Sequence, residues 1–135
     1  MRIVLDTNVV VSGLLSAVGP PAQVLDLVSS GDISLVVDER ILGDYQDVLA
    51  RPQFKFGIRE IRDVLTLARD AEYVIGAPLP FALQDPDDEP FLEVAVAGAV
   101  DALVTGNEKH FKVLGGRLAI PILGPRRFLE ILAGR

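Results

Sequence analysis

The sequence has no cysteine and no tryptophan, and it has one histidine, His110. The lack of cysteine excludes a disulfide scaffold, a thiolate zinc site and a cysteine nucleophile. A catalytic triad or a histidine metal site would depend on His110 alone. Apolar runs are also short. The most apolar stretches, 9–19 and 94–100, fall short of the roughly 18 to 20 residues that a membrane-spanning helix needs, so we expect no membrane span.

Basic residues are fewer than acidic ones. The sequence has 13 Lys and Arg residues and 19 Asp and Glu residues. The resulting net charge of −6 argues against broad electrostatic affinity for nucleic acid. Half of the residues are hydrophobic and the mean hydropathy is +0.38, which excludes intrinsic disorder. A length of 135 residues predicts one domain, 1–135. An acid at position 6 comes too early for a secretory signal, and we expect a cytoplasmic protein.

Short β-branched runs alternate with helical patterns along the chain. We expect strands at 2–5, 33–37, 73–75, 102–105 and 119–123, and helices at 8–16, 21–30, 39–50, 58–71, 88–99 and 125–133. This alternation predicts a three-layer α/β/α sandwich with a mostly parallel central sheet. Ligands bind such sheets beyond the carboxyl ends of the strands, where the strand order reverses. Asp6 and the segment 105–107 follow two of the expected strands, and they mark the expected site.

Two acidic residues lie on helix faces that are otherwise apolar. Asp44 comes three residues after Ile41 and four before Val48, which places it on the inward stripe of its helix. Asp88 precedes Phe91 by three residues and lies on the same face. An ionised carboxylate that faces inward without a partner costs several kcal/mol or shifts its pKa until it is neutral. These positions therefore call for a partner of opposite charge.

Asp6, Asp44 and Asp88 would repel one another if they met above the sheet, unless a cation lay between them. The hard ions Mg²⁺ and Mn²⁺ prefer carboxylate and water oxygens. Such an ion lowers the pKa of bound water and stabilises charge on a phosphoryl oxygen. Each acid also has a structural interpretation: Asp6 and Asp88 suit the first turns of the helices that follow them, and Asp44 suits the edge of its stripe. The residues alone leave this choice open.

Four motifs, in order, resemble the PIN domain family. They are Val4-Leu5-Asp6-Thr7-Asn8-Val9, the segment 41–49 followed by Arg51-Pro52, the segment 85–95, and Ala102-Leu103-Val104-Thr105-Gly106-Asn107. The similarity runs from Ile3 to about Leu123, and it is to the VapC-like ribonucleases that are toxins of toxin–antitoxin systems. The resemblance implies a small α/β sandwich, cleavage of RNA phosphodiester bonds with Mg²⁺ or Mn²⁺, an antitoxin partner and a homodimer.

The resemblance also implies roles for single residues. Asp6, Asp44 and Asp88 correspond to the catalytic metal ligands. Thr7 and Asn8 correspond to residues that fix the turn after the first strand, and Thr105 orients the end of a later strand.

One position departs from the family pattern, because Asn107 stands where the family usually has an aspartate. A neutral amide can orient a water or the substrate, so Asn107 stays a catalytic candidate, but it weakens affinity for a divalent ion. A one-metal or poorly active enzyme, and a PIN-like binding module without catalysis, are therefore open alternatives.

Candidate RNA contacts are few. Arg51 and Lys55 lie near two phenylalanines and form either a basic rim with stacking aromatics or a solvated face. Lys109 follows Asn107 and is placed to meet a phosphate near the metal. A third interpretation of the chain, a receiver-type Mg²⁺-binding domain, would need paired acids after the first strand and a lysine after the last. Asp6 stands alone after the first strand, and no such lysine is present.

Overall fold

The structure, a computed structural model, describes residues 1–114 and 118–134. The strands are β1 (Arg2–Leu5), β2 (Ser34–Val37), β3 (Glu72–Tyr73), β4 (Ala102–Val104) and β5 (Ile122–Leu123). The α-helices are α1 (Thr7–Leu15), α2 (Pro20–Ser29), α3 (Glu39–Leu49), α4 (Ile58–Arg69), α5 (Glu89–Gly98) and α6 (Pro125–Ala133). Three 3₁₀ segments join them: η1 (Pro52–Phe54), η2 (Pro86–Asp88) and η3 (Glu108–Leu114).

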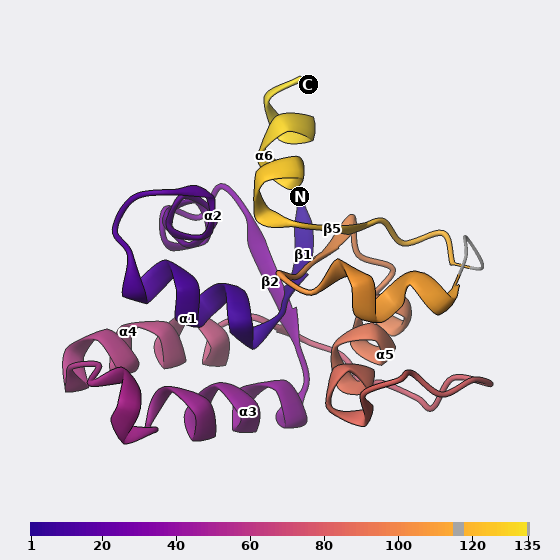
Figure 1. The fold of residues 1–135 in the computed structure, drawn as a ribbon, viewed down its shortest axis with the longest axis horizontal. Coiled ribbons are helices and arrows are strands. Elements are labelled where there is room, and N and C mark those ends of the chain that lie inside the picture. Colours follow the sequence, from indigo (N-terminus) through magenta and orange to yellow (C-terminus); the bar gives the residue numbers. More distant parts are fainter. Residues whose placement is uncertain (115–117, 135) are drawn as a thin grey trace.

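The strands form one parallel sheet in the order β3-β2-β1-β4-β5 (Figure 1). Leu5 of β1 pairs with Val104 of β4, and Ile3 pairs with Leu35 of β2 on the other side. From β1 the chain proceeds outward to β2 and β3, and then returns to add β4 and β5 at the opposite side. The strand order therefore reverses between β1 and β4, which is the place where ligands bind in such sheets.

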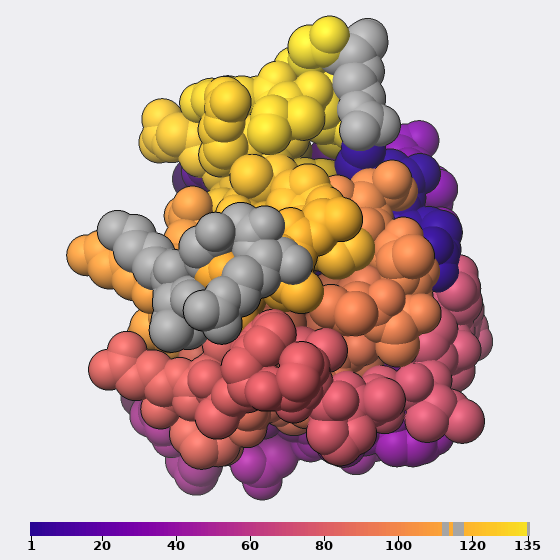
Figure 2. Space-filling view, turned by 90° about the vertical axis from the view of Figure 1, so that its right-hand side faces the viewer, coloured from indigo at the N-terminus to yellow at the C-terminus, as the bar shows by residue number. Residues whose placement is uncertain are grey.

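Helices cover both faces of the sheet. In Figure 1, α1 to α4 lie to the left of the strands and α5 to the right, where it packs against β1, β2 and β4. Figure 2 shows this second side, with the chain around α5 filling its lower half and α6 at the top. α6 packs against α2 and β4. The predicted three-layer α/β/α sandwich is confirmed.

The central strands are apolar on both sides because both of their faces are covered. Ile3, Val4 and Leu103 have no exposed surface, and neither has Val36 of β2. Such uninterrupted apolar runs are typical of strands in the middle of a parallel sheet. Along the described chain, no single helix is long and apolar enough to cross a membrane; α1 and α2 pass that test only together, at a bend of 102°.

The edge strands differ most from the prediction. The strand expected at 73–75 is the two-residue β3 at Glu72–Tyr73, and the one expected at 119–123 shrinks to β5. An edge strand pairs on one side only, and Pro121 has no N–H to donate to a ladder. The predicted helices all form, with ends shifted by at most two residues, and 125–133 matches without a shift.

Candidate functional site

A pocket of about 450 Å³ opens at the carboxyl ends of β1 and β4. Asp6, Asp44, Asp88 and Asn107 all line it, although they come from four separate segments of the chain. The other lining residues include Thr7, Asn8, Arg51, Phe54, Asp85, Asp87 and His110. The four residues that sequence predicts as catalytic are thus brought together, at the point where the strand order reverses.

Asp6 is the first residue after β1, and it is tied to β4 through both its backbone and its side chain. Its N–H donates to the Val104 carbonyl at 2.9 Å, and Thr105 Oγ1 donates to Asp6 Oδ2 at 2.7 Å. Asp6 takes the N-cap position of α1, but its side chain makes no capping hydrogen bond. The Asp6 carboxylate therefore does not cap α1.

Burial raises the pKa of Asp6, and the negative charges of Asp88 and Asp44 raise it further. The hydrogen bond from Thr105 works in the opposite direction. Asp6 is only 5 % exposed, so water screens these interactions poorly. The charges of Asp44 and Asp88 therefore act on Asp6 inside one pocket.

Asp44 lies on the inner side of α3, half-buried, and its carboxylate accepts a hydrogen bond from Thr7 Oγ1. The next residue, Tyr45, is fully buried, and its hydroxyl donates to the Leu5 carbonyl at 2.5 Å. Asp38 caps the start of α3 by accepting from the Ile41 N–H at 2.9 Å. These bonds fix α3 over the end of β1, directly before Asp6.

Asp88 ends η2 and precedes α5, where it is 7 % exposed. Like Asp6, it stands at an N-cap position without a side-chain capping bond. Its Oδ2 lies 2.8 Å from His110 Nδ1. Burial raises the pKa of Asp88, the bond to His110 lowers it, and the charges of Asp85 and Asp87 raise it.

Asp85, Asp88 and His110 each offer one ligand atom, and these atoms lie within 4.8 Å of one another. Within 1–114 and 118–134, this is the group of acidic and histidine side chains compact enough to share one metal ion. The sequence predicts Asp88 as a metal ligand, but it does not predict Asp85 or His110 as ligands. A signal for Asp85 exists, because residues three apart lie on the same side of a 3₁₀ turn.

The segments after β1 and β4 are joined by hydrogen bonds through their turn residues. Asn8 Oδ1 accepts from the Gly106 N–H at 3.0 Å, and Thr105 Oγ1 accepts from the Asn107 N–H at 3.0 Å. Thr7 makes the separate bond to Asp44, and the positioning roles of Thr7, Asn8 and Thr105 stay predictions.

The profile of the PIN domain family matches residues 2–109. The chain belongs to the PIN domain family. It is also 26% identical to an uncharacterized protein of Methanocaldococcus jannaschii, over 96% of this chain and 90% of that protein. Among solved structures, VapBC2 from Rickettsia felis, bound to a DNA fragment from its promoter, matches with a TM-score of 0.57. That match covers 91% of this chain and 97% of the other at 18% identity, so it shows the fold alone.

The basic residues predicted to contact RNA differ in whether they line the pocket of this PIN domain. Arg51 lines the pocket, next to Phe54, whose ring stacks on Phe56 with centroids 5.4 Å apart. Lys55 and Lys109 are exposed and lie outside the pocket lining. Arg51 is therefore the member of this group that lines the same pocket as the acids.

Replacing Thr105 by valine is expected to destabilise this PIN domain by about 1–3 kcal/mol, because the buried Asp6 carboxylate and the partly buried Asn107 N–H lose their partner. Thr105 has no exposed surface, and its hydroxyl serves both Asp6 and the Asn107 N–H. Urea unfolding followed by circular dichroism measures the change. Thr66→Val on the exposed side of α4 is the matched control. Equal effects of the two variants would contradict the role given to Thr105.

Proposed function

We propose that this PIN domain, taken as one unit over 1–135, is a Mg²⁺- or Mn²⁺-dependent endoribonuclease and the toxin of a toxin–antitoxin pair. One observation carries the proposal: Asp6, Asp44 and Asp88, from three distant segments, line one pocket, and the charges of the other two raise the pKa of Asp6. Gathering like charges in a half-closed pocket costs free energy, and a bound cation offsets that cost.

The donor chemistry suits a hard divalent ion, although the ligand atoms of Asp6, Asp44 and Asp88 are spread more widely than those of Asp85, Asp88 and His110. Asp6, Asp44 and Asp88 offer carboxylate oxygens, and Asn107 offers a neutral amide oxygen at the same pocket. We infer that the three aspartates would hold the ion. When bound, the ion would lower the pKa of a coordinated water and offset charge on a phosphodiester oxygen.

The chain's own residues would position these groups. Thr105 holds the Asp6 carboxylate and Thr7 holds that of Asp44, so each keeps its other oxygen free of these bonds. Arg51, on the pocket lining, is placed to pair with a phosphate of the RNA, and Phe54 offers a ring on which a base can stack. Asn107 would orient the attacking water or the substrate.

Mn²⁺ is expected to stabilise the wild-type fold more than the Asp6→Asn variant. At about 100 times the dissociation constant, an ion that binds only the folded state adds about 2.7 kcal/mol, which corresponds to a rise in Tm on the order of 10 °C. Thermal unfolding in EDTA and in Mn²⁺ measures the rise. Exposed Asp63→Asn serves as control and should keep it. Equal shifts for wild type and Asp6→Asn would contradict the ligand assignment.

The same variant tests the raised pKa of Asp6. The folded state holds this proton more tightly than the unfolded chain, so the free energy of unfolding falls as pH rises from the ordinary pKa to the raised one. In EDTA at neutral pH, Asp6→Asn should therefore unfold at a higher temperature than wild type. The advantage should fade as pH falls below about 4, the ordinary aspartate pKa.

A second candidate function is a PIN-like binding module without catalysis, and the amide at Asn107 favours it. A wild-type chain that binds Mn²⁺ but leaves RNA intact would support this alternative. Cleavage that starts with Mn²⁺ and stops with EDTA supports the nuclease.

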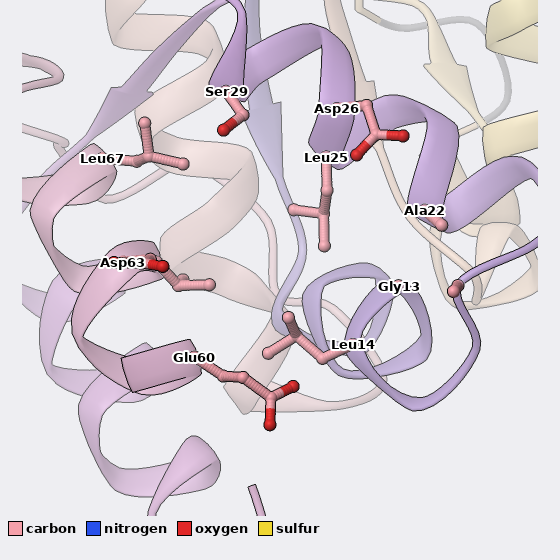
Figure 3. Close-up of a pocket in the computed structure, with 11 residues that line it drawn as sticks. Gly13, Leu14, Ala22, Leu25, Asp26, Ser29, Glu60, Asp63 and Leu67 are labelled. Carbon is pink, nitrogen blue, oxygen red and sulfur yellow. The ribbon is translucent and has the colours of Figure 1, made fainter. Parts of the chain in front are cut away.

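We also propose that the antitoxin docks in a groove between α1, α2 and α4, of about 350 Å³ (Figure 3). Leu14, Leu25 and Leu67 lie on its apolar part, and the acidic groups Asp26, Glu60 and Asp63 surround them. Its lining contains no lysine or arginine. The groove therefore fits a partner segment that carries apolar residues flanked by basic ones.

Co-purification with the product of the adjacent gene tests this docking site. Reversing the charge of two exposed rim residues, in the variant Asp26→Lys/Asp63→Lys, should weaken capture of that product, while Lys109→Glu on a distant exposed position should not. Sedimentation of the isolated chain tests the homodimer. Undiminished capture by the rim variant would contradict the groove.

A further inference from the structure

Asp85, Asp88 and His110 form a compact donor set beside the acids Asp6 and Asp44. The set combines two carboxylates with one imidazole nitrogen, and its atoms lie within 4.8 Å of one another. An octahedral ion with bonds of about 2.1 Å holds neighbouring donors about 3.0 Å apart and opposite donors about 4.2 Å apart. The spacing of the set is close to what one ion requires.

Local structure explains why these three side chains meet. Asp85 precedes the 3₁₀ segment η2 and Asp88 ends it, so the two lie three residues apart on one side of the turn. The Asp87 N–H donates to Asp85 Oδ1 at 2.9 Å, which fixes the carboxylate and leaves its Oδ2 free of this bond. His110, from the 3₁₀ segment η3, reaches Asp88 at 2.8 Å. An ion would need this pair of atoms to separate by only a few tenths of an ångström.

We propose that Asp85, Asp88 and His110 form a second cation position, one that takes a divalent transition-metal ion in preference to Mg²⁺ and shares Asp88 with the position at Asp6 and Asp44. This inference rests on the proposed nuclease, and it specifies how its metal site is completed. Asn107 offers only a neutral amide at this pocket, and His110 and Asp85 on the same lining would supply the further donors.

The chemistry of the donors sets the preference. Mg²⁺ binds oxygen ligands and gives up its waters reluctantly, whereas imidazole nitrogen is a good ligand for first-row transition ions. A position with one nitrogen and two carboxylate donors therefore favours an ion such as Mn²⁺. The position built from Asp6, Asp44 and Asp88 has oxygen donors alone and accepts both ions.

Metal titration of the full chain, with Mn²⁺ and Mg²⁺ as probes, tests the proposal. Calorimetry and the loss of the free Mn²⁺ signal in electron paramagnetic resonance count the bound ions. Wild type should bind two Mn²⁺ and one Mg²⁺, and both His110→Gln and Asp85→Asn should bind one of each. Asp87→Asn removes the same charge from the same turn but lies outside the donor set, and it should keep two Mn²⁺.

Pulsed electron paramagnetic resonance adds a readout that a merely structural role would not change. An imidazole nitrogen coupled to bound Mn²⁺ should appear in wild type and disappear in His110→Gln, whose fold circular dichroism verifies. Two Mn²⁺ in His110→Gln, or no nitrogen coupling in wild type, would overturn the second position. If Asp6→Asn still abolishes metal-dependent cleavage in that case, the proposed function survives; absence of any bound ion in wild type would overturn both.

Discussion

Asp6→Asn is expected to reduce metal-dependent cleavage of RNA by roughly 100- to 1000-fold, the range seen when one preorganised electrostatic contact is lost at an active site. The amide has the shape of the carboxylate and can still accept the hydrogen bond from Thr105, so the change removes charge and little else. Initial rates on a labelled RNA, with Mn²⁺ at saturation for wild type, measure the loss.

Two further variants make this result specific. Asp88→Asn should lower the rate to a similar extent, because Asp88 lines the same pocket and its charge acts on Asp6. Asp63→Asn, at an exposed position on α4, should leave the rate within a factor of about two, as is usual for surface changes. Cleavage by Asp6→Asn at the wild-type rate would refute the assignment of this acid.

Tyr45→Ala is expected to lower the free energy of unfolding by about 3–5 kcal/mol. Tyr45 is fully buried between α3 and the end of β1, so its removal leaves a cavity and an unpaired Leu5 carbonyl. Urea unfolding measures the loss, with Tyr73→Ala on the exposed edge strand as the control. A loss below 1 kcal/mol would contradict this anchoring role.

Tyr45→Phe separates the hydrogen bond from the packing. It keeps the ring and removes only the hydroxyl that donates to the Leu5 carbonyl, and we expect a loss of about 1–3 kcal/mol. If the Tyr45→Phe variant is as stable as the wild-type protein, the packing of the ring alone fixes α3.

The sequence could predict the features that depend on local pattern. The apolar runs of β1 and β4 predict buried parallel strands, and the spacing of Asp44 from Ile41 and Val48 predicts a carboxylate on the inner side of α3. Asp38 is of a residue type that is favoured at N-caps, and it accepts the hydrogen bond from the Ile41 N–H. In each case a few neighbouring residues determine the outcome.

The features that could not be predicted depend on tertiary contacts or on weak local preferences. His110 reaches Asp88 only because η3 and η2 lie side by side, and no local pattern records the distance between segments 22 residues apart. The edge strands β3 and β5 are short because each has one partner strand. Lys55 and Arg51 are close in sequence, yet Arg51 lines the pocket, whereas Lys55, which has a left-handed backbone conformation, does not.

Anomalous diffraction from crystals soaked in Mn²⁺ tests the central claim most directly, since it places the ion relative to each carboxylate. A Mn²⁺ peak coordinated by the side chains of residues 6, 44 and 88 is the predicted result. A density map at the same Mn²⁺ concentration that leaves these three carboxylates without an ion, or shows each of them neutralised by a side chain of the protein, would contradict it.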